Sequence, residues 1–446
     1  MISIQYPFDK NSLSLGEIQT NKKYIHFRIS ELQFFKAFWH TGRVSHMKKY
    51  FFSTPWLILF FFTPIYAQQI PTRPDTPGAE ARPNLPNRLA MVSESNYLTQ
   101  LALKGFNLET QGLLIESLDA HTVYAELNSN VGFNPASVIK VATSFAALAT
   151  FGPEYHFETS FYSDGAINKK TRTLTGNLVL QSTGDPVLTS IDVNRLLRDV
   201  VRLGITRVSG DLVIAGPFTY GIFSTNDKAT KALALMMRRA GIKVGGKTTE
   251  GTLRGTRITT HVSSSLQDIL FYQNAHSVNQ IAERLGEALG GPKAVEKFLI
   301  KDIGIAPSDV TISHSSGLDY NRITPRATVT LFRELVFWLN LNNLQPQDVL
   351  PVAGVDRGTL QRRFVGQEYR GAVIGKTGTL PGTEGGVSTL AGVMYTRDYG
   401  PVIFAIFNTK GSVSTYRKLQ DDFLKGFLAE SGGIPDTNAS LHRLNN

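Results

Sequence analysis

Strand-like segments stand at both ends of the apolar part of the chain, and helical patterns lie between them. Apolar residues alternate as in a hairpin over Gly112 to Leu127, and further strand-like runs cover 371–379, 387–395 and 401–409. Helical spacing occurs at 228–240, 277–289, 294–302, 324–341 and about 414–429. Since sheets and helices must bury their apolar faces against each other, we expect one α/β sandwich closed by the two terminal segments.

Residues 157–216 have a different character. Strand-like stretches occur at 157–162, 173–181 and 208–214, around one helix from about 191 to 203. We interpret this part as a small inserted α/β domain. The main domain would then comprise 89–156 and 217–432, followed by a flexible tail over 433–446.

The segment that begins at Met47 has the three-part layout of a secretory signal. Lys48 and Lys49 precede an apolar stretch, and Ala67 is a small residue at the expected cleavage point. Two prolines interrupt the stretch, whereas a membrane span needs about 20 clean apolar residues. We therefore expect a cleaved signal peptide at 47–67. A retained N-terminal anchor, with peripheral membrane association, is the alternative.

The rest of the N-terminal region follows from that interpretation. Residues 1–46 lie upstream of the signal and are expected to be a non-native extension that precedes the true start at Met47. Residues 68–88 contain five prolines and almost no large apolar side chain, which indicates an extended linker. The mature protein is expected to work in the periplasm or elsewhere outside the cytoplasm.

Composition excludes several classes of site. The chain has no cysteine, which excludes disulfides, thiol nucleophiles and thiolate metal sites. The net charge of +10 divides equally between the first 67 residues and the remainder, and no run of five basic residues occurs, so nucleic-acid binding has little support. His261, His276 and His314 lack ligand spacing, so we expect no metal and no other cofactor.

A serine and a lysine three residues apart lie in the best helix start of the chain. Asn134 is a good N-cap, Pro135 fits the first helical position, and apolar spacing continues to Thr150. Ser137 and Lys140 would share one face of the first turn. The lysine can then take the serine's proton if burial or a nearby cation keeps its amine neutral. The spacing is common by chance, and an ordinary helix start with an exposed lysine is the alternative.

Two further short motifs follow. Ser277-Val278-Asn279 directly precedes a helical pattern. A helix-capping serine would also explain it, and Ser224-Thr225-Asn226 has the same spacing. Lys376-Thr377-Gly378-Thr379 ends a strand-like run and precedes a glycine-rich hairpin. A strand end with a turn glycine is the alternative explanation.

Together and in this order, the motifs S-x-x-K, S-x-N and K-T-G resemble those of the penicillin-binding proteins and β-lactamases. Within that group the chain is similar to the low-molecular-mass class C enzymes, the D-alanyl-D-alanine carboxypeptidase/endopeptidase family. The matching stretches extend over most of residues 100–430 and read NPASVIKVATSFAAL, LVLQSTGDPVLT, VSGDLVI, SSGLDYNRITPR, LPVAGVDRGTLQRRF and GKTGTLPG. The resemblance implies a β-lactamase/transpeptidase-like fold, an antiparallel sheet with helices on both faces.

The resemblance also implies a mechanism. Ser137 would attack the carbonyl of the penultimate D-alanine of a peptidoglycan stem peptide and form an acyl-enzyme, with Lys140 as the general base. Lys376 would lie close by and disfavour protonation of Lys140. Ser277 would pass a proton to the leaving amine, and Asn279 would hold the substrate amide and Lys140.

The resemblance also implies that the third motif, Lys376-Thr377-Gly378-Thr379, binds the substrate. The backbone N–H groups of Ser137 and Thr379 would form the oxyanion hole. Lys376 and the hydroxyls of Thr377 and Thr379 would bind the terminal carboxylate, with Gly378 in the same segment. β-Lactam antibiotics would be covalent inhibitors, and no cofactor is implied.

The chain departs from the family pattern at two points. The 136 residues between Lys140 and Ser277 are fewer than the family usually carries, so one inserted domain is expected to be reduced or absent. Val278 stands where the family commonly has a polar residue, which puts the rate and substrate preference in doubt.

We expect four other charged residues to have structural rather than catalytic roles. Asp185, in Thr183-Gly184-Asp185-Pro186, resembles the family pattern but is expected to form a turn. Arg322, Arg362 and Arg363 are expected to be surface or ion-pair residues rather than ligands.

The leading hypothesis is a serine-type D-Ala-D-Ala carboxypeptidase, with endopeptidase activity on cross-links as a second expected activity. A β-lactamase or esterase on the same scaffold is one alternative, although no dedicated acidic base is found near the serine motif. A non-catalytic peptidoglycan-binding module is another, and it would require a broken set of motifs. The sequence leaves the oligomeric state open.

Overall fold

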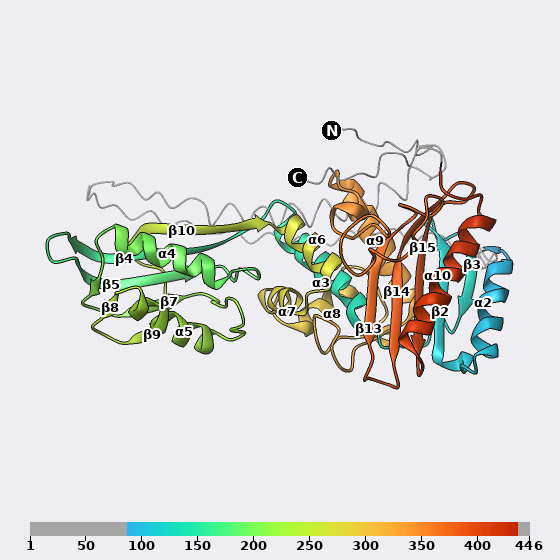
Figure 1. Ribbon diagram of the computed structural model, residues 1–446, viewed down its shortest axis with the longest axis horizontal. Coiled ribbons are helices and arrows are strands. Elements are labelled where there is room, and N and C mark those ends of the chain that lie inside the picture. The colour runs from blue at the N-terminus through green and yellow to red at the C-terminus, as the bar shows by residue number, and fades with distance from the viewer. Residues whose placement is uncertain (1–86, 436–446) are drawn as a thin grey trace, which may run out of the picture. The chain divides into compact units, whose positions relative to one another are not determined.

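The computed structural model describes residues 87–435, and early and late strands of this region share one sheet (Figure 1). The six-stranded sheet has the order β1 (Asn87–Arg88), β3 (Thr122–Leu127), β2 (Gln111–Ser117), β15 (Gly400–Thr409), β14 (Val387–Thr396) and β13 (Val373–Leu380). Neighbouring strands are antiparallel, except that β1 pairs parallel with β3. The pairing of β2 with β15 confirms the predicted sandwich, closed by the two terminal segments.

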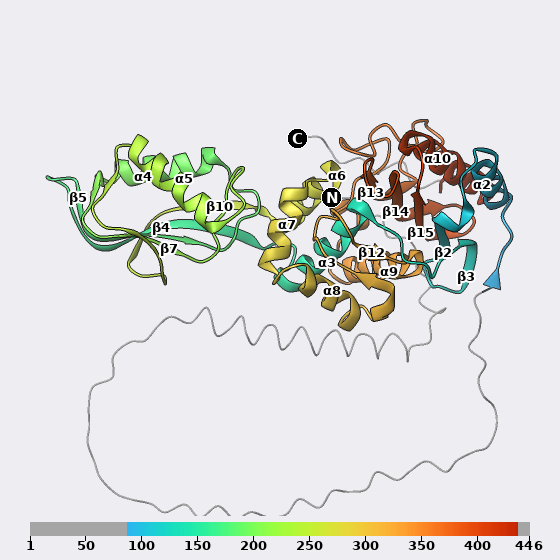
Figure 2. The same cartoon turned by 90° about the horizontal axis from the view of Figure 1, so that it is seen from below.

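Helices cover both faces of this sheet (Figure 2). The helices on one face are α2 (Val92–Leu103) and α10 (Val413–Glu430). The hydrophobic core on the opposite face is formed with α3 (Lys140–Phe151), α6 (Leu266–His276), α7 (Asn279–Ala288), α8 (Pro292–Lys301) and α9 (Pro325–Leu341). Strand β15 shows why both layers are needed. Its side chains alternate, so that Ile403 packs in the core with α3 and α9 whereas Phe404 packs in the core with α2 and α10.

A second sheet has a hydrophobic core of its own. Its seven strands are β4 (His156–Asn168), β5 (Thr173–Ser182), β6 (Arg207–Val208), β7 (Leu212–Ala215), β8 (Lys243–Val244), β9 (Thr248–Glu250) and β10 (Thr256–Ser265), with α4 (Ser190–Arg202) and α5 (Asn226–Arg239). Leu197, Leu233 and Ile242 belong to one shared core. The strands of this sheet continue to Ser265, beyond the boundary that we expected for the inserted domain at residue 216. The edge strand β10 pairs with β4 over a sequence separation of about 100 residues, from Thr256 with Ser163 to Ser265 with His156, and local patterns do not reveal such a pairing.

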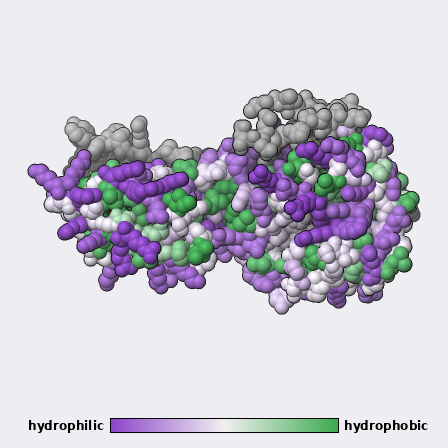
Figure 3. Space-filling model, in the orientation of Figure 1, coloured by the Kyte–Doolittle hydropathy of each residue, from purple (hydrophilic) through white to green (hydrophobic). Residues whose placement is uncertain are grey.

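Short elements connect the larger ones. They are the 3-10 turns at Leu108–Thr110, Ala136–Ile139, Pro307–Asp309 and Pro346–Asp348, and the strand pair β11 (Val310–Thr311) and β12 (Arg322–Ile323). Figure 3 shows hydrophobic residues scattered among hydrophilic ones over the face that it draws.

The N-terminal expectations fall mostly outside the described residues. This holds for the upstream extension at 1–46, the signal peptide at 47–67 and the linker up to residue 86, and also for the tail from residue 436 on. The last two residues of the expected linker, Asn87 and Arg88, pair with Thr122 and Val123. Between residues 87 and 435, no helix combines the length and the apolar character needed to cross a membrane.

Candidate active site

Ser137 lies on a tight turn at the entrance to α3. We expected one helix from Ala136, but residues Ala136–Ile139 form a 3-10 turn and the α-helix begins at Lys140. The Asn134 side chain accepts a hydrogen bond from the Ala136 N–H at 3.0 Å, and Ala136 has a positive φ of 46°. This strained entry leaves Ser137 partly exposed at the end of a buried helix.

Lys140 is fully buried and is surrounded by oxygen atoms. Its Nζ donates to Ser137 Oγ at 2.9 Å, to Asn279 Oδ1 at 2.7 Å and to the Ser316 carbonyl at 2.6 Å. Burial lowers the pKa of Lys140 to about 7, and the negative charge of Glu283 opposes that shift. A neutral amine keeps two N–H donors for Asn279 and Ser316, which leaves its lone pair to accept the Ser137 proton.

The second motif sits at the junction of α6 and α7. Ser277 ends α6 in the left-handed conformation, with a φ of 57°, and α7 starts at Asn279. Val278 occupies the N-cap position and makes no side-chain cap bond, so the helix-capping interpretation of Ser277 is wrong. The Ser277 Oγ instead accepts a hydrogen bond from Lys376 Nζ at 2.9 Å.

Lys376 is the second buried lysine of the site. It lies on β13 with no exposed surface, and its Nζ also donates to the Thr377 carbonyl at 2.7 Å. Burial lowers the pKa of Lys376 well below its usual value, and the charge of Lys140 lowers it further. We expected the charge of Lys376 to lower the pKa of Lys140. The charge effect is found in the opposite direction, from Lys140 on the pKa of Lys376, and burial is the leading cause of the lowered pKa of Lys140.

The three motifs therefore meet in one place. Hydrogen bonds join Ser137 to Lys140 and Lys140 to Asn279, a further bond joins Ser277 to Lys376, and the two lysines interact through their charges. The second S-x-N sequence, Ser224-Thr225-Asn226, is not part of this cluster. Its Asn226 side chain accepts a hydrogen bond from the Phe218 N–H in the inserted domain. An exposed lysine, which was the alternative for the first motif, is likewise excluded by the burial of Lys140.

Gly378 permits β13 to lie against the nucleophile turn. A Cβ atom at this position would stand 2.1 Å from Thr389 Oγ1 and 2.5 Å from the Pro135 carbonyl oxygen. Thr389 Oγ1 also donates to that same carbonyl at 2.8 Å. The glycine of the K-T-G motif is thus required for packing, beyond the turn role that its sequence position suggests.

Several residues of the site were missed in the sequence. Ser316 supplies its carbonyl to Lys140, and its N–H donates to Glu283 Oε1 at 3.0 Å. Ser316 lies in the stretch SSGLDYNRITPR, whereas Glu283 is signalled only by its place one helical turn after Asn279. We found no acidic group near the serine motif in the sequence, but the structure places the Glu283 carboxylate close enough to Lys140 to influence its charge. That carboxylate accepts its hydrogen bond from the backbone N–H of Ser316.

A hairpin residue links the segments around the nucleophile. Glu384, in the hairpin after β13, accepts from Asn134 Nδ2 at 3.0 Å and pairs with Arg322 at 2.9 Å. Asn134 Nδ2 also donates to the Asp319 carbonyl at 2.8 Å. These bonds fix the nucleophile turn, the hairpin and the loop before α9 relative to one another.

Asp185 and Arg363, which we expected to have structural roles, make no hydrogen bond to the residues of the three motifs. The Asp185 Oδ1 accepts from the Val187 N–H at 2.8 Å, as in the expected turn, and its Oδ2 lies 3.5 Å from His261. Arg363 is buried and paired with Asp421 at 2.6 Å. Among residues 87–435, no group of histidine and acidic side chains could hold a metal ion.

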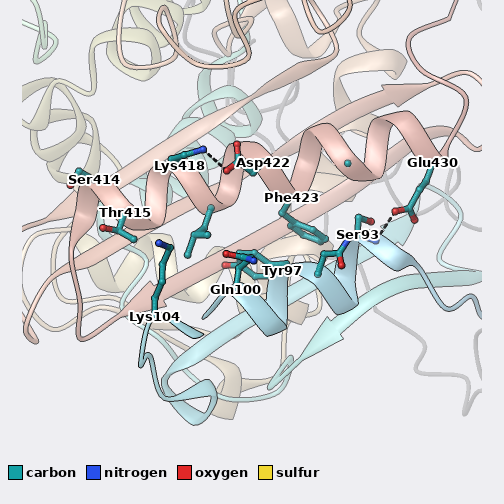
Figure 4. A pocket seen from close by; sticks show the side chains of 13 residues that line it. Ser93, Tyr97, Gln100, Lys104, Ser414, Thr415, Lys418, Asp422, Phe423 and Glu430 are labelled. Atoms are coloured by element: carbon teal, nitrogen blue, oxygen red, sulfur yellow. Dashed lines mark hydrogen bonds and ion pairs between the residues drawn. The ribbon is translucent and has the colours of Figure 1, made fainter. Parts of the chain in front are cut away.

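A groove of about 540 Å³ lies between α2 and α10 (Figure 4). Its lining includes Ser93, Tyr97, Lys418 and Phe423, and no residue of the three motifs. No serine in that lining is hydrogen-bonded to a lysine or a histidine, so the arrangement at Ser137 is the better candidate for nucleophilic chemistry.

Comparison with known proteins gives a consistent result. Residues 95–219 and 215–425 match the D-Ala-D-Ala carboxypeptidase 3 (S13) family. The D-alanyl-D-alanine carboxypeptidase DacB of Haemophilus influenzae is 23% identical over 415 residues, which covers 67% of this chain and 84% of that protein.

Solved structures show the same fold. Penicillin-binding protein 4 (dacB) of Haemophilus influenzae, in complex with a β-lactam, matches with a TM-score of 0.63 and 22% identity, over 75% of this chain and 98% of that one. Bd3459, described as a predatory peptidoglycan endopeptidase of Bdellovibrio bacteriovorus, matches with a TM-score of 0.58 and 18% identity, over 72% and 93%.

The packing of Gly378 can be tested by stability. Gly378→Ala should lower the free energy of unfolding of the main domain by about 1–3 kcal/mol, because the new methyl group overpacks the contact with Thr389 and Pro135. Gly382→Ala is the matched control, since a Cβ there meets no atom within 4 Å, and it should change stability by less than about 0.5 kcal/mol. Urea unfolding followed by tryptophan fluorescence measures both. Equal midpoints for the two variants would contradict the packing role.

Proposed function

Because the chain belongs to the D-Ala-D-Ala carboxypeptidase 3 (S13) family, we propose that Ser137 is the nucleophile of this serine-type D-Ala-D-Ala carboxypeptidase and Lys140 its general base. The observation that carries the assignment is the 2.9 Å contact between Ser137 Oγ and Lys140 Nζ, together with the lowered pKa of Lys140. A base whose pKa lies near the working pH is both deprotonated and able to accept a proton.

In the acylation step, Lys140 takes the hydroxyl proton of Ser137 while Oγ forms a bond to the carbonyl carbon of the penultimate D-alanine. The carbonyl oxygen gains the negative charge and accepts hydrogen bonds from the N–H groups of Ser137 and Thr379. Such an oxyanion hole contributes about 3 kcal/mol per donor.

Breakdown of the tetrahedral intermediate needs a proton on the leaving nitrogen. Ser277 is suited to supply it, since its Oγ accepts from Lys376 and its own hydroxyl proton is therefore left to donate. The C–N bond breaks and D-alanine leaves. Ser277 then regains the proton that Lys140 took from Ser137, so that Lys140 is neutral again before deacylation. The hydrogen bond from Lys376 holds Ser277 Oγ in place for this exchange.

In the deacylation step, water attacks the ester carbon and gives one proton to Lys140. The ester bond breaks, and Ser137 Oγ regains a proton from Lys140. Both half-reactions thus use the same base and the same oxyanion donors, and no atom of the protein is consumed.

Substrate binding is assigned to the end of β13 and the start of α7. Thr377 and Thr379 offer hydroxyls, and Gly378 keeps their strand close to the nucleophile. Asn279 is exposed, and while its Oδ1 accepts from Lys140 its amide NH₂ can donate to the substrate backbone. Peptidoglycan stem peptides ending in D-Ala-D-Ala are the proposed substrates.

β-Lactams are proposed as covalent inhibitors that acylate Ser137, since a strained lactam carbonyl reaches the same nucleophile and oxyanion donors. Support comes from a relative of this fold, Bd3459, for which a penicillin G acylated structure is described. Endopeptidase activity on cross-linked peptides is a second proposed activity, supported by the description of Bd3459 as a peptidoglycan endopeptidase.

The proposed place of action is the periplasm or another extracytoplasmic compartment. The signal-like segment from Met47 to Ala67 and the absence of cysteine are compatible with export, and peptidoglycan lies outside the inner membrane. A retained N-terminal segment would give peripheral membrane association. The mass of the mature N-terminus decides between cleavage and retention.

The nucleophile is tested with fluorescent penicillin and with a peptide ending in D-Ala-D-Ala, on the protein from residue 68 on. The account predicts stable labelling and D-alanine release, and both should fall by at least about 10⁴-fold in Ser137→Ala. Label that decays quickly without D-alanine release would favour a β-lactamase. Equal labelling of the protein and Ser137→Ala would contradict the assignment.

The two S-x-N motifs provide a matched pair. Ser277→Ala should lower the rate of D-alanine release by about 10²- to 10⁴-fold, because the leaving amine loses its proton donor. Ser224→Ala makes the same change in the exposed rival motif and should leave the rate unchanged. Steady-state kinetics with the D-Ala-D-Ala peptide give the comparison, and a similar loss in both variants would argue against the relay.

A further inference from the structure

An exposed arginine from the last helix lies on the K-T-G-T segment. Arg417, on α10, donates from its Nη2 to Thr379 Oγ1 at 2.8 Å. Its side chain is exposed, and no carboxylate within residues 87–435 forms an ion pair with it. A guanidinium has five N–H donors in a planar fork, so most of its hydrogen-bonding capacity is left for a ligand.

The position of Arg417 is fixed by buried groups. Its carbonyl accepts from the Arg363 Nη2 at 3.2 Å. One turn further along α10, the buried Gln420 donates to the Ser388 carbonyl at 3.1 Å, and Ser388 is the register partner of Thr379 on β14. The helix is therefore anchored directly across from Thr379, which places the guanidinium at the end of the strand that we assign to the substrate.

The other cations nearby are less suited to an anionic ligand. Lys376 is fully buried, and its Nζ already donates to Ser277 Oγ and to the Thr377 carbonyl. Lys418, the neighbour of Arg417, donates to Asp422 at 2.7 Å in the groove between α2 and α10 (Figure 4). Arg417 is the exposed cation in contact with Thr379.

We propose that Arg417 is a specificity-determining residue that binds, together with Thr379, the α-carboxylate of the amino acid released by the enzyme. The inference rests on the proposed function of Ser137 and of the K-T-G-T segment. A guanidinium fork matches a carboxylate in a two-bond geometry, which a lysine cannot reproduce. The site would thereby favour leaving residues whose α-carboxylate is free over residues in which it is blocked.

The test uses two peptides that differ only at the C-terminus, one ending in D-Ala-D-Ala with a free carboxylate and the other with that carboxylate amidated. Arg417→Gln should lower kcat/KM for the free acid by about 10- to 100-fold, chiefly through KM, and leave the amidated peptide nearly unchanged. The preference for acid over amide should therefore largely disappear. Arg417→Lys should restore part of it, since the charge returns without the fork.

Lys418→Gln is the matched control, because it removes the same charge one residue further along and should keep the wild-type preference. An unchanged acid preference in Arg417→Gln would overturn the inference. An equal loss for both peptides would also overturn it, because Arg417 would then only support Thr379. Failure of the proposed function is distinguishable, since the wild-type protein would then release neither D-alanine nor D-alaninamide.

Discussion

The burial of two lysine side chains is the constraint on which the active site depends. Lys140 and Lys376 have no exposed surface, and a charged ammonium in such surroundings costs several kcal/mol of desolvation free energy. The protein meets this constraint by surrounding Lys140 with three oxygen atoms and by lowering its pKa to about 7. The same burial that is unfavourable for a charge thus produces an amine able to take the proton of Ser137.

The fold brings these lysines together from distant parts of the sequence. Lys140 begins a helix that is buried on one face of the sheet, and Lys376 lies on the edge strand β13. The absence of a side chain at Gly378 lets the strand approach the nucleophile turn, and Glu384 ties the following hairpin to Asn134. The terminal segments also contribute, because α10 carries Arg417 to the end of the same strand.

Local patterns in the sequence predicted most of the helices and strands and the three motifs, but not the contacts around them. The i, i+3 spacing of Ser137 and Lys140 correctly placed both on one turn. The left-handed backbone of Ser277 and the role of Glu283 depend on contacts between segments far apart in sequence, which no periodicity records. For the same reason the inserted domain was predicted to end at residue 216, although the strands of its sheet continue to the edge strand β10 at Thr256–Ser265. Helices α2 and α6 were not predicted either.

The central claim is that Lys140 is neutral near physiological pH, and the most direct measurement is its own titration. The protein is labelled with ¹³C-lysine, the Cε signal of Lys140 is assigned through its loss in Lys140→Met, and its chemical shift is followed from pH 5 to 11 by NMR. The account predicts a midpoint at about 7, so that the general base is deprotonated above that pH. A midpoint near the ordinary lysine value of 10.5 would contradict it, because Lys140 would then be charged and unable to accept the proton of Ser137.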